Sequence, residues 1–446
     1  MSCPAFYNRR LELTIEKLIY GGDGLAHLPA DARGKGKAVF VPFVLPGEQV
    51  EVSVTEHKPG FVRARLHRVV QAAAGRVEPA CPYFGQCGGC QYQQASYEEQ
   101  LSIKTDILRE TLRRTAKIEF DGEILVHPSQ PWNYRNRARM RVRAQPEFAI
   151  GYNRFTSGAL LPVRECPIGG ALINRALAAM WKLGEAGKVP AGVVEVEFFA
   201  NGEDSELLLE VTLASQSCNW PALAEFARAV REEIPAIVGV VPFQRATNAS
   251  VARIDVPDKF GADFGSDFLV YRTANANYRV SAGSFFQTNR FLVDEMVEVA
   301  MADRAGGFAL DLYAGVGLFS LALSQTFRQV AAVESAAFSF HDLQANSPSN
   351  VTGYRVEVDK FLAQVPAETR FDYVVVDPPR GGLGEKAARA AARLKAPQFT
   401  YVSCDPATLA RDLRVLTQAG YRIRAMHLLD VFPQTFHIET VVWLEL

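Results

Sequence analysis

This chain of 446 residues contains few cysteines and lacks long hydrophobic runs. Seven cysteines are too few for a secreted scaffold held by disulfides, so we interpret them as reduced thiols, ligands or catalysts. The amino end, MSCPAFYNRR, has no apolar stretch of the kind a secretory signal needs. The longest clean apolar run, AVFVPFVL at 38–45, is far too short to span a bilayer. We therefore expect a cytoplasmic protein that is not embedded in a membrane.

The composition is otherwise that of an ordinary globular protein, with 48% hydrophobic and 22% charged residues, which excludes wholesale disorder. The net charge of −1 conceals an asymmetry. Residues 1–150 carry 21 Lys and Arg against 16 Asp and Glu, whereas the remainder carries 27 against 33. A local basic face is enough to bind nucleic acid, so the near-neutral total does not exclude it.

The chain divides into three parts by pattern. Residues 1–70 contain about five short strands with period-two alternation, punctuated by glycine, which predicts a small β-barrel of the OB type. Residues 71–285 hold a cysteine cluster, a charged helix at 96–118, and then mostly strands with helices near 171–183 and 221–233. From 286 to 446 strands alternate with helices, which is typical of a doubly wound parallel sheet.

Four strands of this last part end in residues that could bind a ligand or take part in a reaction. They run into the turn DLYAGVGLFS (311–320), Glu334, DPPR (377–380) and SCDP (403–406). Ligands of open α/β sheets bind at the carboxyl ends of the strands, and Glu334 follows Asp311 at the distance expected of a carboxylate that binds ribose hydroxyls. The glycine turn departs from the dinucleotide pattern G-x-G-x-x-G, since Ser320 follows Gly315 and Gly317. S-adenosylmethionine is therefore favoured over a nicotinamide cofactor.

Cys404 precedes a strong helix start. Asp405 is a good N-cap and Pro406 a good first residue, so the thiol is expected beside a helix amino terminus, where the dipole favours thiolate. A thiolate is the nucleophile that pyrimidine C5 chemistry requires, although most lone cysteines are inert and buried. Glu439, at the start of the last strand, is a candidate general base, and His437 is a second. By itself such a glutamate more often lies on the surface.

Two further clusters stand out. Cys81, Cys87 and Cys90, with Cys166 beyond them, have a spacing compatible with zinc or with an iron–sulfur cluster. Cys3 and Cys218 are interpreted as ordinary thiols. Arginines at every second position would project from one face of a strand toward RNA phosphates, because few acidic residues are near them in sequence. They are Arg135, Arg137, Arg139, Arg141 and Arg143. The alternative is a solvated face paired with carboxylates.

Over essentially the whole chain, these motifs resemble the RNA uracil-5 (5-methyluridine) methyltransferases, of the 23S rRNA type that carries a TRAM domain and a [4Fe-4S] cluster. The anchors are SFFQTN (284–289), DLYAGVG (311–317), DPPRGG (377–382), SCDP (403–406) and FPQTFHIE (432–439). The resemblance implies that Cys404 adds to uracil C6 and that Glu439 removes the C5 proton. It also implies a pocket for S-adenosyl-L-methionine and the target base. The residues expected there are Gln287, Tyr313, Gly315, Gly317, Glu334 and Asp377.

The resemblance further implies a [4Fe-4S] cluster on Cys81, Cys87, Cys90 and Cys166, and 23S rRNA as a partner in preference to tRNA. No obligate protein partner is inferred. Ala314, Leu318 and Gln434 depart from residues frequent in the family, but none of them is a reacting group.

The expected fold is an α/β protein in three parts. They are a TRAM-like barrel (1–70), a mostly β central iron–sulfur and RNA-binding domain (71–285) and a class I Rossmann-like methyltransferase domain (286–446). The helix at 96–118 is a candidate for packing on the methyltransferase domain. Two alternatives stay open: an amino-group methyltransferase built on DPPR, and an RNA-binding or redox-responsive iron–sulfur protein without methyltransferase activity.

Overall fold

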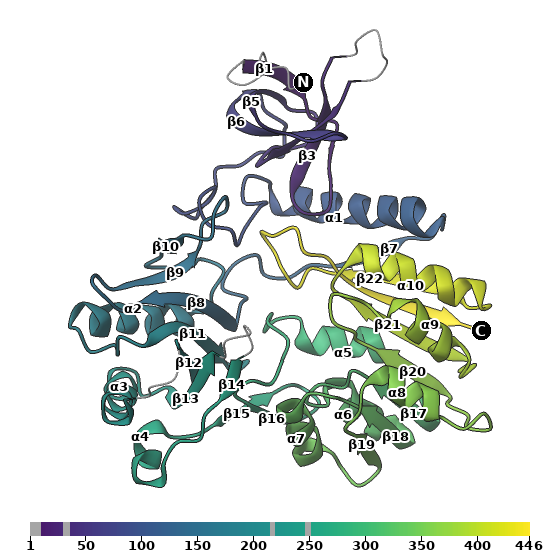
Figure 1. Cartoon of the computed structure of the whole chain (residues 1–446). Helices are drawn as coiled ribbons and strands as arrows, with labels where there is room; N and C mark the ends of the chain where they lie inside the picture. Colours follow the sequence, from purple (N-terminus) through teal and green to yellow (C-terminus); the bar gives the residue numbers. More distant parts are fainter. Residues whose placement is uncertain (1–9, 30–35, 215–218, 246–250) are drawn as a thin grey trace.

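The computed structural model describes residues 10–29, 36–214, 219–245 and 251–446. Figure 1 shows a small amino-terminal sheet standing above two larger parts that lie side by side, one built on a central sheet and one on a carboxyl-terminal sheet. No helix among the described residues is long and apolar enough to cross a membrane. Cys3 and Cys218 lie outside the described residues.

The amino-terminal sheet has six strands in the order β1-β5-β6-β4-β3-β2. They are β1 (Arg10–Thr14), β2 (Lys17–Leu18), β3 (Asp23–His27), β4 (Ala38–Pro42), β5 (Gln49–His57) and β6 (Phe61–Gln71). The predicted alternation is present, since Val50, Val52 and Val54 are all buried in one core. The exposed positions between such apolar residues on β6 include arginines.

The central sheet has seven strands in the order β10-β9-β8-β11-β12-β13-β14, and only β12 and β13 run parallel. The strands are β8 (Arg137–Arg143), β9 (Ala149–Asn153), β10 (Leu160–Pro162), β11 (Val193–Ala200), β12 (Leu207–Leu213), β13 (Ile237–Arg245) and β14 (Val251–Arg253). Helices α2 (Ala171–Glu185) and α3 (Trp220–Glu233) form where the sequence predicts them, and their apolar sides share one core with this sheet. A 3₁₀ turn (Asp258–Phe260) and the short α4 (Gly261–Phe264) follow β14.

The carboxyl-terminal sheet has eight strands in the order β19-β18-β17-β20-β21-β23-β22-β7. Its strands after residue 300 are β17 (Gly306–Leu312), β18 (Phe327–Val333), β19 (Val351–Tyr354), β20 (Tyr373–Val376), β21 (Gln398–Ser403), β22 (Arg422–Leu429) and β23 (Glu439–Glu445). The strands from β19 to β21 run parallel, whereas β23 is antiparallel to β21 and β22. This is the alternating α/β arrangement that the sequence predicts.

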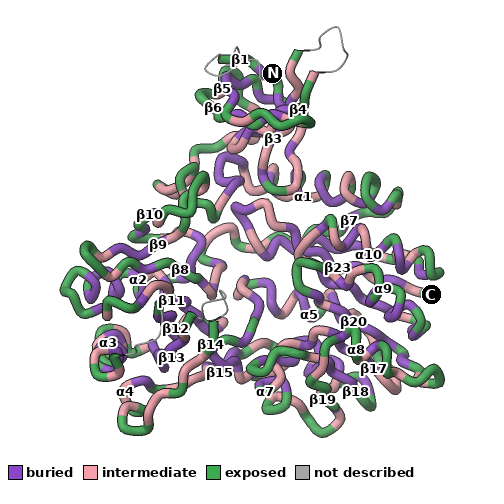
Figure 2. The backbone as a smooth tube through the Cα atoms, viewed as in Figure 1, coloured by how far each residue is buried: buried purple, intermediate pink, exposed green. Residues whose placement is uncertain are grey.

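Helices cover both faces of this sheet. They are α5 (Val293–Met301), α6 (Leu318–Thr326), α7 (Ala337–Asn346), α8 (Val358–Gln364), α9 (Gly384–Ala392) and α10 (Pro406–Gln418). Residues of α8, α9 and α10 share a core with Leu310 and Val374, and residues of α5, α6 and α7 share the opposite core with Ala309 and Val375. Figure 2 shows buried residues running along the strands of both large sheets.

Two early segments belong to the carboxyl-terminal sheet in space. Helix α1 (Tyr97–Thr111), which continues as a π-helical turn (Leu112–Ala116), packs against α10, and β7 (Ile124–His127) pairs in parallel with β22. The hairpin of β15 (Phe268–Arg272) and β16 (Asn277–Ser281) also packs into a core with this sheet. A division of the chain at residue 285 therefore does not follow the sheets. Strand β7 comes before that residue in sequence, yet it is the edge strand of the carboxyl-terminal sheet.

Candidate active site at the carboxyl edge of the sheet

The predicted strand-end residues meet along one edge of the carboxyl-terminal sheet. Tyr313, Glu334, Asp377 and Cys404 each follow directly after one of the parallel strands β17, β18, β20 and β21. These strands are neighbours in the order β18-β17-β20-β21, so the four residues form a row at a single edge. Motifs that lie far apart in sequence are thus brought together by parallel pairing.

Glu439 reaches the same edge from the other direction. Strand β23 is antiparallel to β21, and its register pairs Thr440 with Ser403, so Glu439 begins its strand where Cys404 leaves the neighbouring one. Glu439 is only 4% exposed, which excludes the surface position that is more common for such a residue. A cysteine and a glutamate are therefore adjacent at the end of the row.

The glycine-rich turn has a strained backbone. Tyr313 has a φ of 66°, and Gly315 and Gly317 have φ values of 58° and 99°. Left-handed backbone at a non-glycine residue is costly and is concentrated at ligand sites, which fits the predicted role of Tyr313. The amide N–H of Gly315 donates to Glu334 Oε2 over 2.9 Å, so the turn and the following strand end are held together.

Asp311, just before this turn, is a site residue that the sequence analysis left without a role. It is fully buried, and Ser320 Oγ donates to its Oδ2 over 2.6 Å. Burial raises the pKa of Asp311 to about 7, with smaller contributions in the same direction from Asp377 and Glu334. Its second oxygen has no hydrogen-bond partner within the described part of the chain. A buried acceptor of this kind, beside a strained turn, is available to a ligand.

The SFFQTN segment lies opposite the strand ends. Gln287 is buried, and its Nε2 donates to Asp377 Oδ2 over 3.5 Å. Ser284 Oγ donates to the buried Asp342 carboxylate on α7 over 2.6 Å, which anchors the segment. Phe285, between these two anchored residues, is 61% exposed. Burial raises the pKa of Asp377 to about 7.

The predicted helix start at Cys404 is present. The Asp405 side chain caps α10 by accepting from the amides of Ala407 and Thr408, and Pro406 is the first helical residue. The helix dipole favours a thiolate, but the groups around the sulfur act in the opposite direction. Burial, followed by the charges of Glu439 and Asp377, raises the pKa of the Cys404 thiol to about 12, and Arg380 opposes this only in part.

Glu439 and His437 differ sharply as bases. Burial and the nearby Asp377 raise the pKa of Glu439 well above its usual range. Burial and the cations Arg380, Lys104 and Arg135 lower the pKa of His437 to about 3, so its imidazole is neutral and weakly basic. Arg380 lies 3.3 Å from His437 Nε2 through one guanidinium nitrogen. Arg380 was not among the site residues predicted from the sequence, although its place in the DPPR motif could have indicated it.

The loop that leads into Glu439 is held by helix α1. Lys104 and Asp430 form an ion pair of 2.5 Å in which both side chains are fully buried, and Lys104 Nζ also donates to the Phe432 carbonyl over 2.9 Å. Gln100 and Gln434 exchange hydrogen bonds of 3.0 and 2.8 Å. Loss of one partner from a buried pair typically costs about 3–5 kcal/mol, so α1 is a rigid support for this loop. Gln434, a departure from the family pattern, has a structural partner here.

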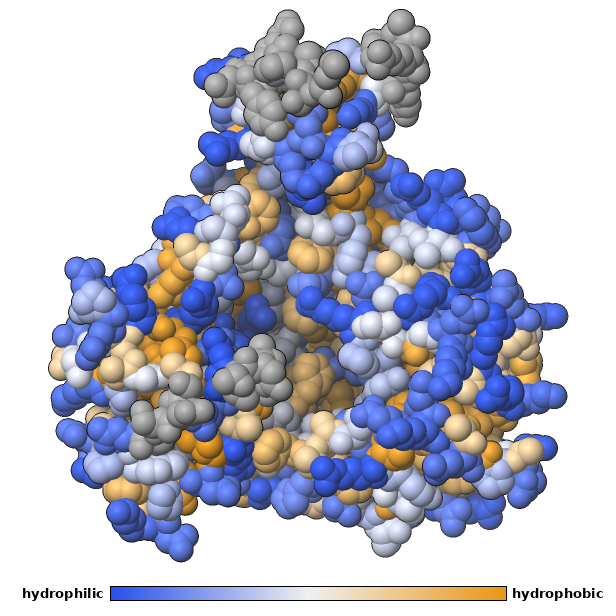
Figure 3. All heavy atoms as spheres, viewed as in Figure 1, coloured by the Kyte–Doolittle hydropathy of each residue, from blue (hydrophilic) through white to orange (hydrophobic). Residues whose placement is uncertain are grey.

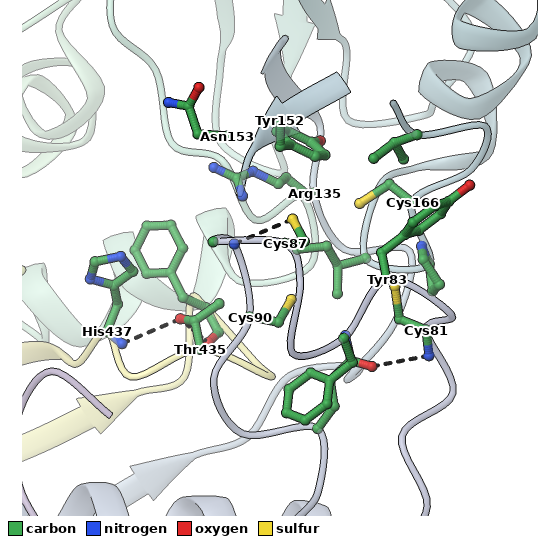
Figure 4. Close-up of a pocket in the computed structure, with 18 of the residues that line it drawn as sticks. Cys81, Tyr83, Cys87, Cys90, Arg135, Tyr152, Asn153, Cys166, Thr435 and His437 are labelled. Atoms are coloured by element: carbon green, nitrogen blue, oxygen red, sulfur yellow. Dashed lines mark hydrogen bonds between the residues drawn. The ribbon is translucent and has the colours of Figure 1, made fainter. Parts of the chain in front are cut away.

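The four predicted ligand cysteines line one cavity of about 370 Å³ (Figure 4). None of them forms a disulfide. Burial raises the pKa of Cys87 to about 11 and that of Cys90 to about 12, and Cys166 contributes to both. The described residues contain no group of three or more His, Cys, Asp or Glu side chains that could hold a metal ion. Thus the thiols surround a common space without converging on one point.

The same cavity extends to the DPPR and FPQTFHIE motifs, because Arg380, Thr435 and His437 line it as well. Figure 4 shows His437 and Thr435 on the side of the cavity that faces away from Cys81 and Cys166. Figure 3 shows the surface hollowed between the central and carboxyl-terminal parts, below the amino-terminal sheet. The cysteine site and the strand-end site are therefore neighbours in space.

The five predicted RNA-binding arginines do not share one environment. Arg137 is mostly buried between Glu197 and Glu210, and Arg139 forms ion pairs with Glu195 and Glu197. Glu195 and Glu197 lie on β11, which pairs with β8, and Glu210 lies on β12, the strand beyond it. All three are far from the arginines in sequence, so the sequence pattern did not reveal them. Arg135 lines the cysteine cavity.

Arg141 and Arg143 remain at the outer end of β8. Both are exposed. Arg141 donates to the Asn153 side chain over 3.1 Å, and Arg143 donates to the Glu147 carbonyl over 3.1 Å. They are the members of the row that are best placed to reach a phosphate.

Comparison with known proteins identifies the family of this chain. Residues 96–446 match the family described as tRNA (Uracil-5-)-methyltransferase, and residues 5–67 match the TRAM domain. An RNA methyltransferase of Aquifex aeolicus, itself uncharacterized, is 33% identical over 98% of this chain and 99% of its own length. The 23S rRNA (uracil(1939)-C(5))-methyltransferase RlmD of Shewanella piezotolerans is 30% identical over 98% of this chain and 96% of its own length.

Among solved structures, the tRNA (uracil-54, C5)-methyltransferase of Pyrococcus abyssi in complex with S-adenosyl-L-homocysteine has a similar fold. Its TM-score is 0.74 at 24% identity, and the alignment covers 97% of this chain and 100% of that one. The two chains therefore share their fold from end to end.

Proposed function

This chain belongs to the tRNA (uracil-5-)-methyltransferase family, and we propose that it methylates C5 of a specific uridine in 23S rRNA through a covalent adduct between Cys404 and uracil C6. The observation that carries the proposal is the placement of Cys404 and Glu439 on paired strands, at the edge that also holds the glycine-rich turn. Nucleophile, base and methyl donor would then meet around one pyrimidine. The 23S rRNA assignment follows the relative from Shewanella piezotolerans, and tRNA is the alternative.

S-adenosyl-L-methionine supplies an electrophilic methyl group. We assign its binding to Gln287, Tyr313, Gly315, Gly317, Glu334 and Asp377. The backbone of the turn can approach the cofactor closely, because Gly315 and Gly317 have no side chain. The Glu334 carboxylate is suited to accept hydrogen bonds from ribose hydroxyls.

The target uridine must leave its RNA stack to reach Cys404. Phe285 presents an exposed aromatic ring two residues before the anchored Gln287, and stacking on such a ring supports an extruded base. The Cys404 thiolate then adds to C6, which makes C5 nucleophilic toward the methyl group. Burial raises the pKa of the Cys404 thiol, so its proton must pass to a base, water in the open site, before the sulfur adds to C6. Covalent catalysis divides one difficult substitution into easier steps.

Glu439 is the better general base for the C5 proton. A general base works best when its pKa lies above that of an ordinary carboxyl, and burial raises the pKa of Glu439 well above its usual range. The pKa of His437 is lowered to about 3, which makes it a poor acceptor. When Glu439 has taken the proton, the C6–sulfur bond breaks and the thiolate leaves.

The test of this function is covalent trapping. The protein is incubated without oxygen with S-adenosyl-L-methionine and either a 5-fluorouridine-substituted 23S rRNA fragment or substituted tRNA, and then run on a denaturing gel. Fluorine at C5 cannot leave as a proton, so a retarded band is expected with the rRNA fragment. Its RNA should be attached to the tryptic peptide of residues 396–411, which contains Cys404. A band with tRNA alone would reverse the substrate assignment, and no band with either RNA would contradict covalent catalysis.

We also assign a [4Fe-4S] cluster to Cys81, Cys87, Cys90 and Cys166. The donor set fits, because four thiols without disulfides line one cavity. In a [4Fe-4S] cluster each cysteine binds a different iron, so thiols spread around a space suit a cluster better than a single zinc ion. The cluster would join the segment before α1 to the segment before α2, and the proposed methyl transfer does not draw an electron from it.

Metal content tests this assignment. Protein purified without oxygen is expected to contain about four irons and about four acid-labile sulfides per chain. Cys90→Ser should lower both, and Cys404→Ala is the matched control that should leave both unchanged. Zinc in place of iron, without sulfide, would show that the site is structural zinc.

Arg141 and Arg143 are proposed to contact the RNA backbone. The double variant Arg141→Ala/Arg143→Ala is expected to weaken RNA binding and to reduce the slope of log K against log salt by about 1–2, since each lost phosphate contact removes about 0.7–0.9. Binding is measured from low to moderate salt by filter retention or anisotropy. Arg228→Ala is the control, because that exposed arginine on α3 is paired with Asp263. An unchanged slope would remove this strand from the RNA interface.

A further inference from the structure

The turn between β2 and β3 of the amino-terminal sheet lies against the loops that carry Cys404 and Glu439. The Tyr20 hydroxyl donates to the Cys404 carbonyl over 3.4 Å. Its ring meets Phe436 edge-on, with centroids 5.4 Å apart. One side chain of the amino-terminal sheet therefore touches both the segment of the proposed nucleophile and the segment that leads into the proposed base.

The turn is built to hold Tyr20 in place. The Gly22 amide donates to the Ile19 carbonyl over 3.1 Å, and Gly21 and Gly22 have φ values of 110° and 94°, which favour glycine. A Cβ on Gly22 would lie 2.9 Å from Cβ of Gln91 and 3.7 Å from that of Phe436. The turn is thus packed at Gly22 directly on Gln91, whereas Gly21 faces open space.

The surroundings of Tyr20 keep its hydroxyl a donor. Burial raises the pKa of Tyr20, and the Asp405 carboxylate adds to the effect through its charge and a hydrogen bond. A raised pKa favours the protonated phenol, which can donate a hydrogen bond. Asp405 is the residue that caps α10, so Tyr20 adjoins both the backbone of Cys404 and the cap that orients it.

We propose that Tyr20 is a positioning residue for Cys404, and that the amino-terminal sheet acts in the chemical step as well as carrying basic residues that can face RNA. This inference rests on the proposed role of Cys404 as nucleophile. The phenol contacts the Cys404 peptide and the ring contacts Phe436, so one side chain fixes the segment of the sulfur relative to the segment that leads into Glu439. A role in RNA affinity alone predicts a different kinetic signature.

The experiment compares Tyr20→Phe with wild type in the full chain, under single-turnover conditions at saturating RNA and S-adenosyl-L-methionine. Loss of one neutral hydrogen bond is expected to slow methylation by about threefold to tenfold and to leave the Kd for RNA within about twofold. A residue that only binds RNA would raise the Kd and leave the saturated rate unchanged. That result, or a wild-type rate together with a wild-type Kd, would overturn the proposal.

Tyr421→Phe is the matched control. The Tyr421 hydroxyl donates to the Ala396 carbonyl over 2.9 Å, before strand β21 begins and hence at the opposite edge of the sheet. It loses the same kind of bond, so its melting temperature gives the cost to folding alone, and its saturated rate should match wild type. Cys404→Ala separates the two proposals. If it still methylates RNA, the nucleophile assignment fails, whereas an inactive Cys404→Ala with a wild-type Tyr20→Phe rate overturns only the role of Tyr20.

Discussion

Replacing Cys404 by alanine is expected to lower the rate of uridine methylation by at least about 10⁴-fold, the order of loss seen when a covalent nucleophile is removed. Alanine cannot add to C6, so C5 never becomes nucleophilic. Cys404→Ser should be almost as inactive, because a hydroxyl is much harder to deprotonate than a thiol, and this pocket already disfavours the anion. The measurement is single-turnover transfer of labelled methyl to the rRNA fragment.

Binding measurements keep this result interpretable. Cys404 lies at the strand end next to Asp377 and away from the Gly315 turn, so both variants should bind S-adenosyl-L-methionine and RNA with nearly wild-type affinity. A variant that binds both ligands and is inactive has lost chemistry rather than structure. If Cys404→Ala retained more than about one-hundredth of the activity, direct transfer to an amino group through the DPPR motif would become the better mechanism.

The place of Cys404 was predictable, and its electrostatics were not. Asp405 and Pro406 follow it directly in sequence and predict the start of a helix, which the structure contains. The acids that raise its pKa, Glu439 and Asp377, arrive on other strands and are separated from it by 35 and 27 residues respectively. Local signals therefore located the thiol, whereas its charge state depends on pairings that no short window contains.

The arginine row illustrates the same limit of local patterns. The alternation at 135–143 predicts one strand for all five arginines, whereas the strand in the structure covers Arg137–Arg143 and Arg135 precedes it. The glutamates that pair with Arg137 and Arg139 lie on β11 and β12, and β11 binds β8 directly. Two of the five arginines are thus committed to ion pairs within the sheet, and the basic face available to RNA is smaller than the sequence indicates.

The residues that hold the site loops in place were the hardest features to predict. Lys104 looks like one charge among many in a helix, yet it is fully buried against Asp430. Tyr20 lies in a glycine turn of a different sheet, 384 residues before the residue it contacts. Both arise from packing between parts of the chain, and neither carries a motif. Reacting groups are recognisable from local sequence because their chemistry restricts residue type, whereas a support can be any side chain that fits.

Glu439→Gln is expected to permit methyl transfer but to block release of the methylated RNA from Cys404. Glutamine has nearly the same size, so the buried position stays filled, but it cannot accept the C5 proton. Turnover should fall by about 10²–10⁴-fold, the usual contribution of general base catalysis. Because adduct formation and methyl transfer do not need this base, the methylated adduct should accumulate on ordinary, unfluorinated RNA. A denaturing gel detects it as a retarded band that wild type shows only with fluorinated RNA.

His437→Gln is the matched control, since it changes the other candidate base on the same loop and should cause a much smaller loss without trapped adduct. The pH dependence gives an independent test. Glu439 acts as a carboxylate, so the wild-type rate should rise with pH as this carboxyl ionises. Burial and Asp377 raise its pKa, and the rise must therefore occur above the usual range of a glutamate. Ionisation of Cys404 also raises the rate with pH, so the part of the rise that belongs to Glu439 is the part that Glu439→Gln loses. If Glu439→Gln turns over within a few-fold of wild type and traps no adduct, the proton leaves by another route, and the buried Asp377, whose pKa is about 7, becomes the next group to replace.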